Sequence, residues 1–329
     1  MQKARRRSTD WFRFAVLAVA QIFLTAPAHA QMNAYSAFAP KDPVVAQAFQ
    51  QLRGGQYAEA LVVLRPLADQ GNEAAQYLMG MVHAEGKAVP KDEAQAVAWW
   101  QRSADQGYAP AQYVLAQAIE QGKGVPQDDA LAVSWYRKAA EQGHSAAQAN
   151  LGMAYWSGVG VVQDQVEAVK WFRKAAEQNL GWGQIYLGMA YMQGRGVPKD
   201  EAQGAQWFAK AAEQGYVSAQ NDLGVMYMRG QGVTADYRRA VHWLALAVRR
   251  GDERAERNMK LALGKLPALR LRKAIEVREK PEAAASVIRK AGRREQYYEL
   301  SRSDGWVEVY FKGQNTVGYV SADLLPRNN

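Results

Sequence analysis

The chain has 329 residues, a length that suggests about two domains plus a targeting segment. Apolar residues make up 48% of it and charged residues 22%, which is typical of a folded protein and excludes a disordered one. The chain contains no cysteine, which excludes a disulfide framework, a thiolate nucleophile, a cysteine-based zinc site and an acylated lipoprotein anchor. The formal net charge is +9, and this figure alone suggests nucleic acid or a membrane surface as a partner.

Residues 1–30 have the pattern of a secretory signal peptide. A basic start precedes an apolar run at 14–24, and the small residues Ala28 and Ala30 come just before Gln31. The run is too short to predict a membrane span, and no other run of 18 apolar residues exists in the sequence. We therefore expect cleavage near Ala30/Gln31, an exposed segment at 31–42, and an exported protein, periplasmic or secreted, without a membrane span in the mature chain.

A repeat of 36 residues organises the middle of the chain. Tryptophan, aspartate and glycine residues and Ala–Gln pairs all recur at this interval. One glycine series is interrupted only at Asn179, and Asn is the other residue that tolerates a left-handed backbone. The two clearest series are Trp99, Trp135, Trp171, Trp207, Trp243 and Asp92, Asp128, Asp164, Asp200, Asp236.

The spacings within one repeat predict a helical hairpin. In residues 146–181, small and apolar residues recur at helical intervals as far as Gly158, which predicts a first helix that ends at a glycine cap. Asp164 then stands where an N-cap carboxylate accepts backbone N–H groups, and a second helix that contains Trp171 follows. A single hairpin cannot bury its own faces, so we expect the hairpins to stack into a right-handed α-solenoid. The tryptophans should lie in its core, packed against small residues of the first helices.

The repeats resemble a known family. We predict five repeats at 74–253, a capping hairpin before them at 43–73 and a capping helix after them at 254–267. The motifs Ala-Gln-x-x-Leu-Gly-x-x-Tyr, Gly-x-Gly-Val-x-x-Asp, Ala-x-x-Trp and Lys-Ala-Ala-Glu-Gln-Gly resemble the Sel1-like repeat, a relative of the tetratricopeptide repeat. This resemblance implies an adaptor that binds another protein in a concave groove.

A second domain is predicted at 268–329, where the 36-residue register is lost. Short runs at 275–277, 287–288, 295–300, 305–311 and 317–320 predict five strands, and hence a small all-β barrel. Asp304-Gly305-Trp306 and Gly318-Tyr319-Val320 are among the segments that resemble a bacterial Src-homology-three-like domain. That resemblance implies a contact with a peptide or with cell-wall stems. The predicted fold class is therefore mostly α, a solenoid followed by a small barrel.

Residues able to carry catalysis are few. His83, His144 and His242 each stand at a repeat position that other residue types also occupy, and the repeated aspartates are explained as helix caps. The segment Gly122-Lys123-Gly124 lacks the preceding strand and the following Ser or Thr of a phosphate-binding loop. We therefore predict that the protein is not an enzyme and that it has no metal site and no cofactor.

The predicted binding surface consists of first-helix residues that vary between repeats. Methionine adapts to different partners and aromatic anchors often dominate binding, so Trp156 and Trp182 are the predicted anchors. Ordinary packing between repeats is the alternative explanation for these positions. The predicted groove residues are Tyr77, Met81, Tyr113, Gln117, Met153, Trp156, Trp182, Ile185, Met189, Met192, Val225 and Met228. In the barrel, Tyr297, Trp306 and Tyr319 are predicted to line a cleft.

These observations predict an exported scaffold that binds a protein or peptide of the cell envelope in its groove, with the barrel making a second contact. The alternatives are a peptidoglycan-binding module with the solenoid as a spacer, or a secreted host-contact factor. Residues 254–329 contain 16 basic and 9 acidic residues, whereas residues 31–253 contain 20 and 22. We therefore expect no nucleic-acid partner, and an anionic partner for the barrel that binds less tightly as the salt concentration rises.

Overall fold

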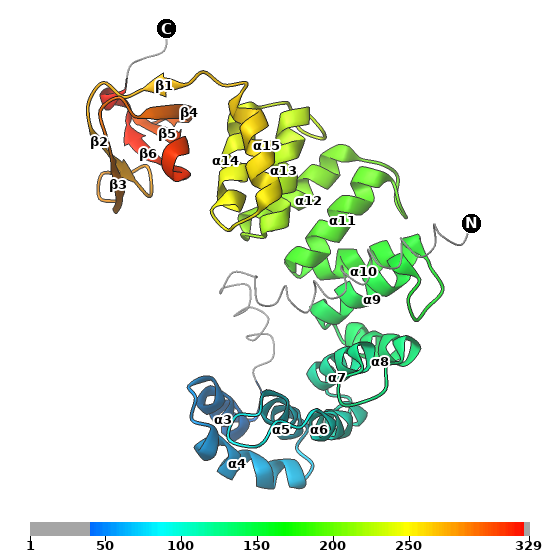
Figure 1. Cartoon of the computed structure of the whole chain (residues 1–329). Helices are drawn as coiled ribbons and strands as arrows, with labels where there is room; N and C mark the ends of the chain where they lie inside the picture. The colour runs from blue at the N-terminus through cyan, green and yellow to red at the C-terminus, as the bar shows by residue number, and fades with distance from the viewer. Residues whose placement is uncertain (1–39, 326–329) are drawn as a thin grey trace. The chain divides into compact units, whose positions relative to one another are not determined.

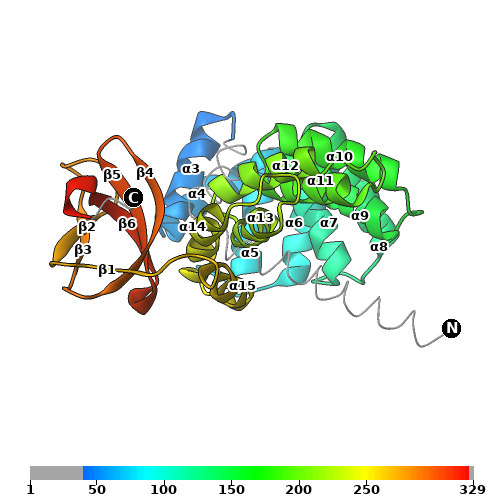
Figure 2. The same cartoon turned by 90° about the horizontal axis from the view of Figure 1, so that it is seen from above.

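The computed structural model describes residues 40–325 (Figure 1). The predicted signal peptide and most of the segment 31–42 lie outside the described residues. The described part is mostly α-helical, as predicted: helical hairpins form a solenoid that is followed by a small β-sheet (Figure 2). The helices are α3 Pro43–Arg53, α4 Tyr57–Asp69, α5 Glu73–Glu85, α6 Glu93–Asp105, α7 Ala109–Gln121, α8 Asp129–Glu141, α9 Ser145–Ser157, α10 Gln165–Glu177, α11 Gly181–Gln193, α12 Glu201–Glu213, α13 Val217–Arg229, α14 Tyr237–Val248 and α15 Glu253–Leu263.

The helix ends follow the local signals in the sequence. Asp128 caps α8 by accepting the backbone N–H of Leu131, and Asp164 caps α10 by accepting those of Val166 and Glu167. The same cap begins α6, α12 and α14, which confirms the predicted role of the aspartate series. Helices α5, α7, α9 and α13 end at a glycine in the left-handed conformation, where a side chain would strain the backbone.

Each hairpin closes around a small residue of its first helix. A Cβ added at Gly152 of α9 would lie 2.6 Å from the Phe172 ring of α10, and one added at Gly224 of α13 would lie 2.6 Å from Leu244 of α14. The side chain that fills this space follows the repeated tryptophan by one residue, whereas the tryptophan shares a buried cluster with other small residues of the first helix, as Trp135 does with Ala111 and Ala116. A helix turns by about 100° per residue, so adjacent residues face different neighbours.

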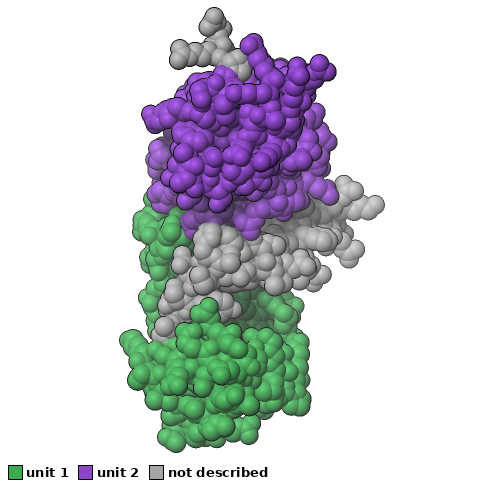
Figure 3. All heavy atoms as spheres, turned by 90° about the vertical axis from the view of Figure 1, so that its left-hand side faces the viewer, with its two compact units in different colours: residues 1–186, 195–197 green, residues 187–194, 198–329 purple. Residues whose placement is uncertain are grey.

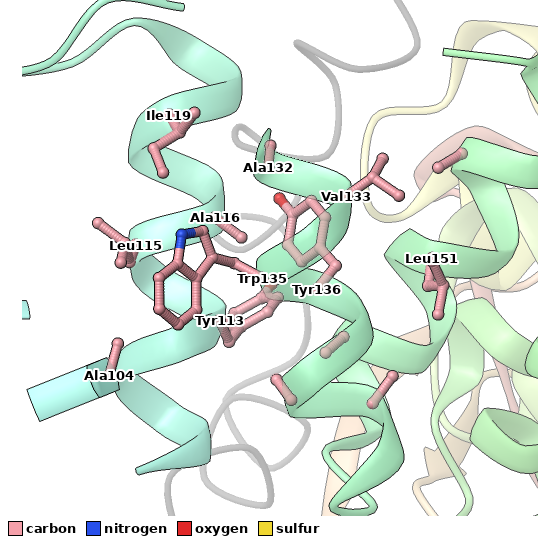
Figure 4. Packing of buried hydrophobic residues seen from close by; sticks show 14 of the residues in the cluster. Ala104, Tyr113, Leu115, Ala116, Ile119, Ala132, Val133, Trp135, Tyr136 and Leu151 are labelled. Carbon is pink, nitrogen blue, oxygen red and sulfur yellow. The ribbon is translucent and has the colours of Figure 1, made fainter. Parts of the chain in front are cut away.

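The repeated tryptophans contribute to the core. Trp99, Trp135 and Trp171 are buried, whereas Trp207 and Trp243 are half-buried. Figure 4 shows Trp135 pointing from α8 toward α7, within a cluster of buried residues that spans several helices. The core prediction is therefore confirmed for the first three members of the series.

Contacts between residues divide the chain into two units (Figure 3). The boundary falls within α11. Unit 1 consists of residues 1–186 and 195–197, and unit 2 of residues 187–194 and 198–329. Two hydrophobic clusters fill the helical hairpins of unit 1. Unit 2 has one cluster where its last helices meet the sheet and another inside the sheet domain.

The C-terminal domain is an open antiparallel sheet. Its strands follow the order β1-β4-β5-β6-β2-β3, and the longest pairing joins β5 to β6. The predicted closed barrel was wrong, because β1 has only two residues, which pair with β4, and no pairing joins β1 to β3 within residues 40–325. The resemblance to a Src-homology-three-like domain stays a prediction. The strands are β1 Leu269–Arg270, β2 Ile275–Arg278, β3 Val287–Ala291, β4 Gln296–Ser303, β5 Trp306–Phe311 and β6 Thr316–Ser321.

The sheet packs against the last helices of unit 2. Tyr298, Leu300 and Tyr310 share a buried cluster with Leu244 of α14 and Met259 of α15. The other face of the sheet covers a separate core that contains Val277, Tyr297 and Phe311. One face of the sheet thus covers apolar surface that the last helical hairpin would otherwise expose.

Candidate functional site

First-helix residues separate into buried and half-buried positions by register. The alanines and leucines common to the repeats are fully buried, for example Ala147 and Leu151 of α9. The neighbouring Met153 is half-buried. The other half-buried residues among the predicted groove positions are Tyr77, Met81, Gln117, Trp182, Met189, Met192, Val225 and Met228. Apart from Gln117, these positions present apolar surface that the packing of the repeats does not fully bury.

Three of the predicted groove residues are buried: Tyr113, Trp156 and Ile185. The guanidinium of Arg195 lies 4.1 Å from the centroid of the Trp156 ring, and Phe172 packs on the same ring at 5.9 Å between centroids. The carbonyl of Trp156 accepts hydrogen bonds from the side chains of Gln163 and Gln165. In this structure Trp156 is therefore a packing residue that offers little surface to a partner.

The other predicted anchor, Trp182, is half-buried at the start of α11. Its ring lies 6.1 Å from that of Tyr186, which stacks at 5.0 Å on Phe172 of α10. This aromatic row holds Trp182 in place while part of its ring stays accessible. Of the two predicted anchors, Trp182 alone combines a fixed position with exposed surface.

Tyr113 is held by two polar neighbours. Its ring stacks on His144 at 4.5 Å, and the side chain of Gln117 donates a hydrogen bond to its hydroxyl at 3.0 Å. His144 caps α9, because its Nδ1 accepts the backbone N–H of Ala147. Burial lowers the pKa of His144 to about 4, so its imidazole is neutral near pH 7. Both side chains are therefore structural in this arrangement.

Glu120 is a polar member of the first-helix surface that the sequence analysis did not select. It occupies the register position of Trp156, Met192 and Met228, and its Oε2 accepts a hydrogen bond from the Tyr136 hydroxyl at 2.8 Å. Burial raises the pKa of Glu120, with a smaller contribution in the same direction from Asp129. A charged residue at an otherwise apolar, variable position was the signal that could have identified it.

A pocket of about 350 Å³ lies in unit 1 beside the first-helix residue Gln117. Its wall includes Ala84 at the end of α5, Trp100 of α6 and Val114 of α7. Its charged side chains are Lys91, Glu93 and Lys123, of which Lys91 and Glu93 form an ion pair at 2.9 Å. The pocket has an apolar wall with charges of both signs, and its volume suits a single side chain or a small ligand.

The residues predicted to line a cleft in the C-terminal domain do not share one surface. Tyr297 is fully buried in the core of the sheet and offers no surface to a ligand. Trp306 and Tyr319 are half-buried on β5 and β6. Tyr319 pairs with Glu308 across the two strands. Side chains alternate along a strand, so Trp306 lies on the same sheet face as Glu308.

That face of the sheet contacts the end of the solenoid through a polar pair. Nδ1 of His242 in α14 lies 2.6 Å from Oε1 of the buried Glu308, and the hydroxyl of Ser301 lies 3.2 Å from Oε2. His242 stands where other repeats carry Lys170 or Gln206, and repeat comparison gave no sign of this partner. The histidine serves tertiary packing, because its partner is 66 residues away in the sequence.

Two features of the described residues bear on other classes of function. Within residues 40–325, no group of three or more His, Cys, Asp or Glu side chains is arranged to hold a metal ion. Among the described helices, none has the length and apolar character needed to cross a membrane.

Comparison with known proteins identifies the same repeats along the chain. The model of the Sel1 repeat family matches residues 73–108, 109–144, 145–180, 183–216 and 217–252. A protective antigen present in uropathogenic Escherichia coli strains, which displays an SLR fold, is 44% identical to this chain with a TM-score of 0.59. The match covers 60% of this chain and 43% of the antigen, so the chain spans less than half of that protein.

A second solved structure agrees with the first. A Sel1 repeat protein from Oxalobacter formigenes is 32% identical with a TM-score of 0.63, and the match covers 68% of this chain and 90% of that protein. No curated protein matches the chain. Because the five family matches together cover more than half of its residues, the protein belongs to the Sel1 repeat family.

Proposed function

We propose that this protein is an exported adaptor that binds a protein or peptide of the cell envelope on the half-buried apolar positions of its first helices. Sel1 repeats generally mediate protein–protein interaction, and proteins built from them are typically non-enzymatic scaffolds. Beyond this general role, we propose export, a partner in the cell envelope and the choice of this surface. Export rests on the signal-peptide pattern at 1–30.

One observation carries the choice of surface. Within the same helices, the positions that keep one residue type are buried, whereas the variable position that Met81, Met153 and Met189 occupy is half-buried in every repeat. Apolar surface left partly in water gains free energy when a partner covers it. Methionine side chains fit partners of different shape, which suits a surface that binds an extended segment.

The test is a cross-linked pull-down from envelope extract with defined variants. Met81→Glu combined with Met153→Glu places two charges on the first-helix surface of unit 1, and we expect the partners of the parent protein to be lost. Circular dichroism melting checks that the variant is folded. Where it is not, Met81→Gln combined with Met153→Gln keeps the side-chain length and replaces it.

A matched control makes the same chemical change outside the proposed surface. Val62 of α4 and Val166 of α10 are exposed, at 76% and 54%, and both lie in unit 1. Val62→Glu combined with Val166→Glu should keep every partner. The proposal fails if the methionine variants retain the same partners as the parent, or if the control loses them equally.

Export needs a separate measurement. We expect the full chain, expressed in a Gram-negative host, to be recovered from the periplasmic fraction with a new N-terminus near Gln31 in mass spectrometry. Recovery of the intact chain from the cytoplasm alone would contradict this part of the proposal.

A further inference from the structure

The C-terminal domain gathers unpaired cations at one end of its sheet. Six basic residues of this region, Arg254, Lys260, Arg278, Arg289, Lys290 and Arg302, lie within 4.0 Å of a carboxylate. Of the remaining basic residues, five lie close together in the sequence around the end of β1 and the turn between β3 and β4, are exposed, and form no ion pair and no side-chain hydrogen bond with any residue of 40–325. These five are Arg270, Arg272, Lys273, Arg293 and Arg294, and we call them the basic rim.

Backbone hydrogen bonds hold the two parts of the basic rim together. The N–H of Leu271 donates to the carbonyl of Glu295 at 3.0 Å, and the N–H of Arg294 donates to the carbonyl of Leu271 at 2.9 Å. These bonds join the segment after β1 to the turn between β3 and β4. The side chain of Leu271 is buried in the sheet core, which fixes the segment that carries Arg270 and Arg272.

The carboxylates near the basic rim do not neutralise it. Glu295 is already bound by Arg289, with both carboxylate oxygens within 2.8 Å of Nη2, and it also accepts the N–H of Gly292. The pKa of Asp323 is lowered first by the Ser321 hydroxyl, and Lys273 makes a smaller contribution. Five exposed cations without paired carboxylates repel one another, and an anionic ligand relieves that repulsion.

The spacing of the rim suits an extended chain. Arg270, at the end of β1, and Arg272 are exposed on either side of the buried Leu271, so both guanidinium groups are open to a ligand. In an extended peptide, side chains at every second position are about 6 to 7 Å apart. Acidic side chains at such positions therefore match the spacing of Arg270 and Arg272. An arginine fork binds a carboxylate through two parallel hydrogen bonds.

We propose that the basic rim binds an acidic, extended peptide segment of the partner protein. The inference deepens the second contact of the proposed function and rests on it. Strand β1 is an edge of the sheet and pairs only with β4 within the described residues, so its outer backbone groups face the bound segment. Tyr297, the aromatic residue that pairs with β1, is fully buried and offers no ring for base stacking, which favours a peptide over a nucleic acid.

The experiment measures binding of a defined probe to the full chain. The probe is a fluorescein-labelled peptide of alternating Glu and Thr, and its fluorescence anisotropy is followed at low salt and at about 0.3 M salt, where charges are screened within a few ångströms. Arg270→Glu combined with Arg272→Glu should raise the Kd at least about tenfold, because two side chains that attract the acidic peptide are replaced by two that repel it. Where that variant does not fold, Arg270→Gln combined with Arg272→Gln replaces it.

The control changes the same number of charges elsewhere on the domain. Lys280 and Lys312 are exposed, and Lys280→Glu combined with Lys312→Glu should change the Kd less than about twofold, because screened charges act over short distances. The proposal is overturned if this control weakens binding as much as the rim variant does. It is also overturned if a peptide of alternating Lys and Thr binds equally well.

Two further outcomes distinguish this inference from lipid binding and from the proposed function. If the rim variant loses binding to phosphatidylglycerol vesicles while the acidic peptide does not bind the parent, the rim recognises lipid and the inference is wrong. If the acidic peptide binds through the rim while the methionine variants still capture every partner, the inference holds and the first-helix surface of the proposed function is wrong.

Discussion

Gln142, at the end of α8, donates a hydrogen bond from its Nε2 to Oε1 of Gln112 in α7 at 2.8 Å. Gln112 is buried and in turn donates to the carbonyl of Ala104 at the end of α6. The same chain of bonds runs from Gln106 through Gln76 and from Gln178 through Gln148. Two glutamines that the repeat places 30 residues apart therefore join three successive helices through hydrogen bonds of their side-chain amides.

Replacing the central glutamine of one such chain should destabilise the solenoid. Gln148→Leu removes two side-chain hydrogen bonds, one donated to the carbonyl of Ala140 and one accepted from Gln178, and the expected cost is about 1 to 3 kcal/mol in the free energy of unfolding. Urea denaturation followed by circular dichroism measures it. Gln127 is exposed, so Gln127→Leu should change stability by less than about 0.5 kcal/mol. Equal stability of the two variants would contradict a structural role for the buried glutamine.

A glycine in the loop between the helices of one repeat fixes that repeat to the one before it. Gly160 has φ of 67°, and a Cβ added there would collide with the backbone carbonyl of Asp129 in α8. Gly143 has φ of 91° and open space around it. Gly143→Ala should cost about 1 kcal/mol through backbone strain alone. Gly160→Ala should cost a further 1 to 3 kcal/mol or so through overpacking. Thermal unfolding compares them, and similar midpoints would rule out the steric contact.

Acid should destabilise the protein through His144. Its pKa is lowered from 6.5 to about 4 by burial, so the unfolded chain binds the proton more readily than the folded one. The neutral imidazole therefore makes its full contribution to the free energy of unfolding above pH 6.5. About 2 to 3 kcal/mol of that free energy is lost as the pH falls toward 4. His144→Asn keeps a residue able to cap α9 and removes the titration. Urea denaturation between pH 7 and pH 4.5 should give the parent the steeper loss, and parallel curves would refute the assignment.

The contact between His242 and Glu308 should hold the sheet on the last helices. His242→Ala leaves the buried carboxyl group of Glu308 with Ser301 as its remaining side-chain partner, and an unsatisfied buried group costs about 1 to 3 kcal/mol. Hydrogen exchange in the β5 amides should then accelerate. His242→Gln supplies a donor again and should restore part of the protection. If β5 exchanges at the parent's rate in His242→Ala, the contact does not hold the sheet.

The sequence by itself determined the repeat, the hairpins and their ends. A helix cap depends on residues within one turn of it, so Asp128 and Asp164 could be assigned as N-caps without a fold. Left-handed positions such as Asn179 depend on the backbone preference of the residue itself. These signals act over a few residues, and the 36-residue period repeats them.

Only the tertiary structure decided which side chains stay accessible. Trp156 and Trp182 were both predicted as anchors from the sequence, yet Arg195 covers Trp156, whereas Trp182 keeps part of its surface. His242 resembles an ordinary repeat variant until the sheet places Glu308 beside it. Such contacts join residues far apart in the chain, and their geometry depends on how helices and strands pack. For the same reason the strand runs could be recognised from alternation, but the open edges of the sheet at β1 and β3 could not.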